Sequence, residues 1–146
     1  MKREILFRAK QLDTGEWIHG IAFPHDDGSC TMFYQHPMDG ALEGREVDPE
    51  SVGEYTGMRD KSDRRIFDGD ILEKISAYVD LQGHEAGGAL VERYVVEWDE
   101  MRWIQRQVYS SRGSIERRLM PIREALLCRF YEVIGNIYDN PGLMQS

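Results

Sequence analysis

The sequence predicts an all-β fold, built of short strands as a barrel or sandwich, with one short helix. Three observations predict it. Apolar residues alternate with polar ones over short stretches, turns rich in glycine and aspartate separate these stretches, and a single stretch has helical spacing. Hydrophobic residues make up 41% of the chain and charged residues 30%. These fractions are typical of a folded domain and argue against disorder.

The first half of the chain holds four predicted strands, each marked by alternating or β-branched apolar residues. They cover residues 3–9, 16–23, 30–35 and 52–56. The first two flank Asp13-Thr14-Gly15, a turn sequence, and therefore predict a β-hairpin. Residues 36–46 contain Pro37, Gly40 and Gly44 and predict a loop. We expect Gly57 to end the fourth strand.

The second half continues this pattern and adds the helix. Its predicted strands cover residues 71–79, 90–98, 101–109 and 131–138. The glycines of residues 80–88 predict a mobile loop, and Asp99-Glu100 predicts a tight turn. Pro121 suits the first position of a helix, and apolar residues follow on one helical face up to Phe130. We therefore expect the short helix near residues 121–128.

Three segments of the chain together resemble the YopX family of phage and prophage proteins. They are Arg3–Ala9 with Trp17 and Gly20, Val47–Gly57 with Asp60-Lys61 and Ile66–Ile71, and Tyr131–Pro141. Their order spans nearly the whole chain, and the likeness is weakest between residues 74 and 130. The resemblance implies an all-β architecture whose C-terminal part is similar to an SH3-like barrel. It implies no assigned enzymatic activity and no established catalytic residue.

The length of 146 residues suits one domain, so we expect a single YopX-like domain over residues 1–146. Within it, we expect an N-terminal β part at 1–62 and a barrel part at 63–146. The candidate motif residues are interpreted as turn-forming or surface positions. They are Tyr55, Thr56, Gly57, Asp68, Gly69, Asp70, Gly135 and Asn136.

Asp68-Gly69-Asp70 favours a tight turn, because Asp and Gly adopt turn conformations and Ile71 then begins a strand. The alternative is a metal or acid–base site built on the two carboxylates. Such a site needs further ligands or a positioned partner, and the sequence offers none at useful spacing. For Gly135 and Asn136 we expect a glycine bulge and an asparagine that bonds its own backbone, rather than chemistry at Asn136.

The histidines and cysteines could in principle form a zinc site or supply a nucleophile. His19, His25, Cys30 and His36 lack the paired spacing of two to four residues that structural zinc sites show. We therefore predict no metal and no cofactor. Cys30 and Cys128 are expected to be thiols that pack as small hydrophobic residues.

The net charge of −8 argues against a nucleic-acid partner, because such proteins usually carry clustered Lys and Arg. The basic segment Arg112–Arg129 leaves open a nucleic-acid-binding module that uses the barrel face. Trp17, Trp98 and Trp103 could stack on bases, but core or interface packing is favoured. The acidity also leaves open a decoy that presents carboxylates to a host DNA-binding enzyme.

No apolar run is long enough to span a bilayer, and the first residues are too charged for a signal peptide. We therefore expect a cytoplasmic location in a bacterial host cell. The favoured function is a non-enzymatic accessory protein that binds another protein or itself, as a homo-oligomer, because small β domains expose strand edges. A hydrolase or metal enzyme built on Asp68, Asp70 or the histidines is the remaining alternative.

Overall fold

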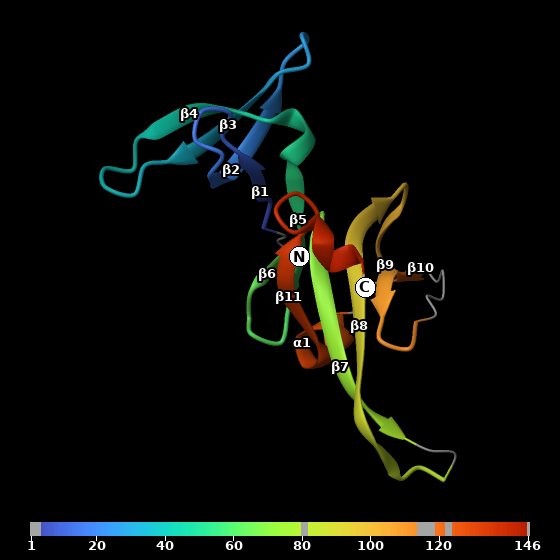
Figure 1. Cartoon of the computed structure of the whole chain (residues 1–146). Helices are drawn as coiled ribbons and strands as arrows, with labels where there is room; N and C mark the ends of the chain where they lie inside the picture. Colours follow the sequence, from blue (N-terminus) through green and yellow to red (C-terminus); the bar gives the residue numbers. More distant parts are fainter. Residues whose placement is uncertain (1–3, 80–81, 114–118, 122–123, 146) are drawn as a thin grey trace. The chain divides into compact units, whose positions relative to one another are not determined.

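The computed structural model describes residues 4–79, 82–113, 119–121 and 124–145 (Figure 1). The chain divides into two compact units. Unit 1 covers Met1–Gly57 and unit 2 covers Met58–Ser146. Strands dominate both units, and the described residues contain one α-helix. This confirms the predicted all-β class with its single short helix.

Unit 1 is an antiparallel sheet in which β1 to β3 each pair with the next strand along the chain and β5 pairs with β1. Its elements are β1 (Phe7–Lys10), β2 (Trp17–Pro24), β3 (Cys30–Gln35), β4 (Leu42–Val47), the 3-10 helix η1 (Pro49–Ser51) and β5 (Gly53–Arg59), whose last two residues belong to unit 2. The spatial order of the strands is β4-β3-β2-β1-β5. The hairpin of β1 and β2 flanks the predicted turn, with Lys10 opposite Trp17.

The sheet of unit 1 curls so that β4 meets the residue that follows β1. Gly20 marks the bend, because residues before it pair with β1 and residues after it pair with β3. A Cβ at Gly20 would collide with the backbone of Phe33, so only glycine fits. At the other end, Gln11 forms an isolated antiparallel bridge with Val47. The curl encloses a core of buried residues: Ala9, Cys30, Met32 and Val47.

Unit 2 is a five-stranded antiparallel sheet with the spatial order β10-β9-β8-β7-β11. Its elements are β6 (Arg65–Phe67), β7 (Asp70–Val79), β8 (Glu85–Asp99), β9 (Arg102–Ser110), β10 (Leu119–Pro121), α1 (Glu124–Phe130), β11 (Tyr131–Asn136) and the 3-10 helix η2 (Pro141–Met144). Figure 1 shows β7 and β8 running on together as a two-stranded ribbon past their neighbours.

This sheet buries apolar residues on both faces. On one face the buried cluster includes Leu127 of α1 and Ile66 of β6, and its sheet members are Leu72, Tyr94, Val96 and Tyr131. On the other face the buried residues are Ile71, Val95 and Val108, with the C-terminal Leu143 and Met144 packed against them. A sheet covered on both faces explains why β7 and β8 are apolar without strict alternation.

The structure also corrects several predicted boundaries. The predicted loop at 36–46 contains most of β4, whose residues Gly44 to Glu46 lack apolar alternation but pair with β3. The strand expected to end at Gly57 continues to Arg59, because glycine accepts the φ of +85° found there. The predicted mobile loop at 80–88 contains the start of β8, although residues 80 and 81 lie outside the described part.

The predicted helix begins later than expected, at Glu124, and Pro121 ends β10 instead. Residues 122 and 123 lie outside the description. The strand expected at 3–9 begins at Phe7, and residues 1–3 are not described. The pairings of the described residues do not close the sheet of unit 2, and the SH3-like barrel stays a prediction.

Candidate functional site

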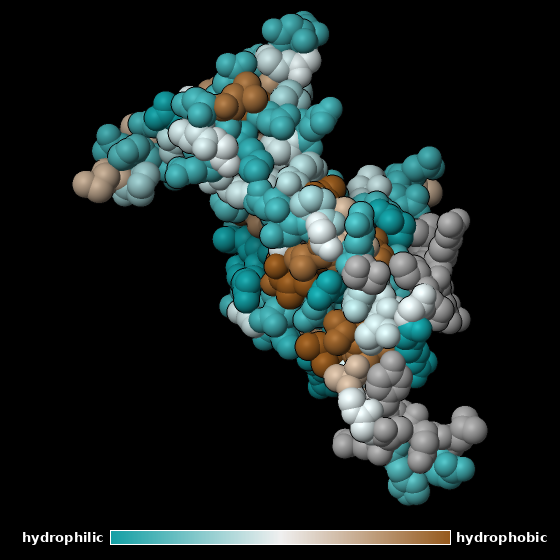
Figure 2. Space-filling view, viewed as in Figure 1, coloured by the Kyte–Doolittle hydropathy of each residue, from teal (hydrophilic) through white to brown (hydrophobic). Residues whose placement is uncertain are grey.

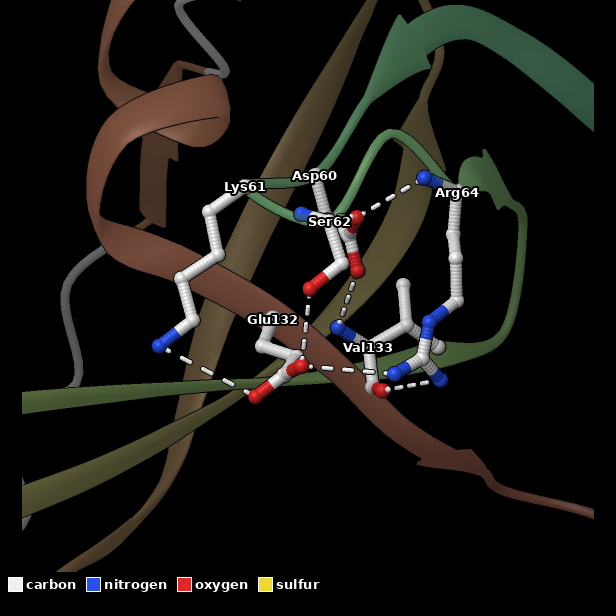
Figure 3. A network of polar contacts seen from close by, with 6 residues as sticks. All are labelled: Asp60, Lys61, Ser62, Arg64, Glu132 and Val133. Carbon is white, nitrogen blue, oxygen red and sulfur yellow. Dashed lines mark hydrogen bonds and ion pairs between the residues drawn. The ribbon is translucent and has the colours of Figure 1, made fainter.

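Asp60 follows β5 directly, and its carboxylate accepts three backbone hydrogen bonds (Figure 3). Its side chain is buried, with 2% of the residue exposed. Oδ1 accepts from the backbone N–H groups of Ser62 and Arg64, each at 2.9 Å. Oδ2 accepts from the backbone N–H of Val133 in β11, also at 2.9 Å. The carboxylate therefore ties the β5–β6 turn to a strand more than 70 residues away.

A second, more exposed layer of charge surrounds this carboxylate. Glu132 lies 3.3 Å from Arg64 and 3.8 Å from Lys61, and its Oε1 accepts from the Ser62 hydroxyl at 3.0 Å. Figure 3 shows these side chains gathered over β11. Exposed ion pairs of this kind contribute little to stability. The inner hydrogen bonds of Asp60 therefore carry the structural role of the cluster.

The turn at Asp68-Gly69-Asp70 joins β6 to β7. Gly69 has a φ of +87°, donates its N–H to the carbonyl of Val96 at 2.8 Å, and accepts from Ile137 N–H at 2.9 Å. Asp70 is 1% exposed, and its Oδ2 accepts from the backbone N–H of Phe67 at 2.7 Å. At least one oxygen of the predicted carboxylate pair therefore serves the turn itself.

Gly135 and Asn136 lie beside this turn. The pairing of β11 with β7 shifts register between Val133 and Gly135, and Asn136 then pairs with Asp70. The Oδ1 atom of Asn136 accepts from the backbone N–H groups of Tyr138 at 3.0 Å and Asp139 at 2.9 Å. The structure thus brings Asp68–Asp70 and Gly135–Asn136 together in unit 2.

Tyr55, Thr56 and Gly57 lie in unit 1, on β5. Tyr55 and Thr56 are buried, at 4% and 5% exposure, and the backbone N–H of Tyr55 donates to the carbonyl of Leu6 at 2.8 Å. Gly57 is exposed and bends the strand. Tyr55 and Thr56 are therefore buried strand residues, and Gly57 is the exposed residue at the bend of the strand.

The histidines and cysteines do not gather around a common point. Within the described part of the chain, no group of three His, Cys, Asp or Glu side chains is placed to hold a metal. His25 Nε2 lies 2.7 Å from the Thr31 hydroxyl, and His36 pairs with Asp39. Cys30 is buried, and burial raises the pKa of its thiol. Cys128 is exposed, so the expectation that it packs as a hydrophobic residue was wrong.

The α1-facing side of the unit 2 sheet carries a buried polar cluster that the sequence reasoning missed. The Glu92 carboxylate accepts from Tyr94 Oη and Gln107 Nε2, each at 2.9 Å. The Gln105 amide donates to Tyr131 Oη at 3.2 Å, and the Tyr94 and Tyr131 rings meet edge to face. Burial, followed by the bond to Glu92, raises the pKa of Tyr94. Gln105 and Gln107 flank Arg106 in the sequence, so the local pattern gave no signal that both side chains are buried.

The tryptophans do not share one environment. Trp103 packs against the core on the α1-facing side, as expected, but Trp98 is 51% exposed and meets Trp103 edge to face. Trp17 in unit 1 lies beneath two cations, with Arg8 Cζ at 4.8 Å and Lys10 Nζ at 5.6 Å from its ring centre. These cation–π contacts stabilise the β1–β2 hairpin, and the two cations cover the Trp17 ring.

The outward face of the unit 1 sheet exposes a row of large apolar side chains, which we call the outer strip. Strand alternation places them on the face opposite the core, and Ile21 pairs directly with Phe33. The strip consists of Ile21, Phe23, Phe33 and Leu42, which are 50%, 56%, 37% and 72% exposed. Figure 2 shows a small brown area on unit 1 and larger brown areas on unit 2.

Comparison with known proteins gives a family and a shared fold for the chain. A family model described as YopX protein matches residues 6–145. The crystal structure of protein EF1440 from Enterococcus faecalis aligns with a TM-score of 0.54 and 20% sequence identity. The alignment covers 99% of this chain and 100% of that one, so the two share a fold. No curated protein matches the sequence. Among the described helices, none is long and apolar enough to cross a membrane.

Proposed function

We propose, since the chain belongs to the YopX family, that it is a non-enzymatic phage or prophage accessory protein that acts by binding protein chains. The observation that carries this proposal is the outer strip of unit 1. The hydrogen bonds of Asp60 and Asp70 to the backbone support it. A cytoplasmic location in the host cell is part of the proposal.

Two carboxylates of the segments that resemble the family, Asp60 and Asp70, favour a structural role because they accept hydrogen bonds from the backbone. Asp60 accepts from three backbone N–H groups, Asp70 Oδ2 accepts from the backbone N–H of Phe67, and both residues are buried. General acid–base catalysis needs a carboxyl group within hydrogen-bonding reach of a substrate. A group that is 1–2% exposed and tied to a turn does not offer that reach.

The outer strip favours binding because its side chains gain from being covered. Full burial of a large apolar side chain contributes about 1.5–3 kcal/mol. Ile21, Phe23 and Leu42 are already half buried or less, so covering each contributes about 1 kcal/mol. A contiguous set of such residues on one sheet face is typical of a protein interface and not of an isolated surface.

The test compares the intact protein with a strip variant, Phe23→Ser combined with Phe33→Ser. Met101→Ser serves as the matched control, since Met101 is 88% exposed in the β8–β9 turn of unit 2. Circular dichroism first establishes that all three proteins keep the same strand content. We expect association, with itself or with a protein from phage-carrying cells, for the intact chain and the control only.

A monomer in light scattering that captures no protein in a strip-dependent way would overturn the proposal. Salt-sensitive binding to DNA or RNA would favour the nucleic-acid alternative instead, for which Arg112 and Arg129 are both exposed. Inhibition of a host DNA-binding enzyme that survives the strip substitutions would favour the acidic decoy.

A further inference from the structure

We infer that the first partner of unit 1 is a second copy of this chain, which pairs with it edge to edge through β4. The two β4 strands run antiparallel about a two-fold axis at Gly44, so their outer strips join into one surface. This inference deepens the proposed function and rests on it, because it names the partner of the same surface.

The backbone of β4 offers an edge for such pairing. β4 is the last strand on its side of the sheet. The carbonyl of Glu46 accepts from Leu12 N–H and therefore points away from β3. Because orientation alternates along an antiparallel strand, Leu42 and Gly44 also direct their N–H and carbonyl groups away from β3. The Leu12 contact covers only the C-terminal end of this edge.

The side chains of β4 select one register. Glu43 and Arg45 flank Gly44 and already lie 3.5 Å apart within the strand, at 35% and 50% side-chain exposure. A two-fold axis at Gly44 places Glu43 opposite Arg45 of the second copy, twice. An axis at Glu43 or at Arg45 places like charges opposite each other, which is destabilising. Charge complementarity therefore singles out the Gly44 register.

Gly44 itself suits the centre of this interface. A Cβ at position 44 would lie 3.0 Å from Phe33 Cε1 and 3.2 Å from Thr31 Cγ2, so the Phe33 ring lies against the bare glycine. With no side chain at the axis, the two Gly44 residues can exchange a pair of backbone hydrogen bonds. The Phe33 rings of both copies then flank the axis, and Leu42 extends the apolar surface beside them.

The test measures self-association by light scattering and sedimentation over a roughly hundredfold range of concentration. The full-length chain should form a dimer. Glu43→Arg should weaken dimerisation at least tenfold, because Arg45 then faces an arginine. The double variant Glu43→Arg with Arg45→Glu restores opposite charges and should restore the dimer. Glu16→Arg makes the same charge change at an exposed turn and should leave dimerisation unchanged.

A backbone variant provides an independent readout. Leu42→Pro removes an N–H that points away from β3, at the first residue of β4 and the most exposed residue of the strip, so the fold should tolerate it. It should weaken the dimer without changing the thermal midpoint of the monomer. Strand content by circular dichroism identifies any variant that fails to fold.

The outcomes separate this inference from the proposed function. A monomer at every concentration overturns the inference, while strip-dependent capture of a different protein would leave the proposed function standing. A dimer that Glu43→Arg and Leu42→Pro leave intact forms through another surface and also overturns the inference. A chain that neither dimerises nor captures a protein overturns both.

Discussion

Removing the carboxylate of Asp60 is expected to destabilise unit 2 strongly, because this buried group accepts three backbone hydrogen bonds. The substitution Asp60→Ala leaves three backbone N–H groups without their acceptor, two in the β5–β6 turn and one in β11. Because Asp60 is 2% exposed, water does not readily take the place of the carboxylate. The turn then loses its tie to Val133.

The magnitude follows from the number of bonds lost. A hydrogen bond to a charged group contributes about 1.5–3 kcal/mol net, and the donors here are part-buried, so the lower part of that range applies. We expect Asp60→Ala to lower the free energy of unfolding by about 4 kcal/mol. Asp60→Asn has one acceptor oxygen in place of two and should cost about 2 kcal/mol. Both are large against a typical total of about 5–15 kcal/mol.

Urea unfolding with tryptophan fluorescence measures this loss in the relevant unit. Trp98 and Trp103 lie in unit 2 and Trp17 lies in unit 1, so a Trp17→Phe background makes the signal specific for unit 2. The midpoint should fall while the slope stays constant, since the surface exposed on unfolding is unchanged. Lys61→Ala is the control, because its exposed ion pair with Glu132 is worth less than about 0.5 kcal/mol.

A cost below about 1 kcal/mol for Asp60→Ala, or one no larger than that of Lys61→Ala, would refute the reasoning. Either result would mean that the turn keeps its geometry without the carboxylate. The proposed structural role of the Asp60 carboxylate would then be wrong. A role of Asp60 in binding or catalysis would have to be considered instead.

Three further predictions concern a glycine, a tyrosine and the cysteines. Gly69→Ala should cost about 2 kcal/mol or more in thermal melts, and Gly83→Ala only about 1, because both have positive φ but only Gly69 packs against a side chain. Above about pH 10 the unfolded chain ionises Tyr94 while the folded chain keeps it protonated, so stability should fall, and less steeply in Tyr94→Phe. Equal slopes would contradict this. A thiol reagent should label Cys128 at once and Cys30 only on unfolding, and a single fast phase for both would contradict the burial of Cys30.

Local reading of the sequence succeeds where the structure is set by neighbouring residues. The third strand lies at Cys30–Gln35, as its flanking turns and alternation predict. The turn at Gly69 is readable from Asp and Gly alone, because both favour turn conformations. The hydrogen bonds from the backbone to Asn136 could also be predicted, because asparagine side chains commonly bond to nearby backbone groups.

The same reading fails where distant partners decide. Residues Leu42–Val47 form a strand because they pair with β3. Their glycine and charged residues do not give the apolar alternation by which a strand is recognised in a sequence. The bond from Val133 N–H to Asp60 spans 73 positions, so no local pattern could reveal it. Glu92 looks like a surface residue of an alternating strand, yet it accepts from two side chains in a buried cluster.

The division between motif and surface suggests how one scaffold can serve different partners. The segments that resemble the family place Asp60, Asp70 and Asn136 in hydrogen bonds that hold turns to strands. The outer strip runs from Ile21 to Leu42, between the first and second of those segments. Substitutions there change what the sheet presents without disturbing the turns, because strand alternation keeps the two faces separate. Under the proposed function, substitutions in the outer strip would therefore change the partner and leave the fold unchanged.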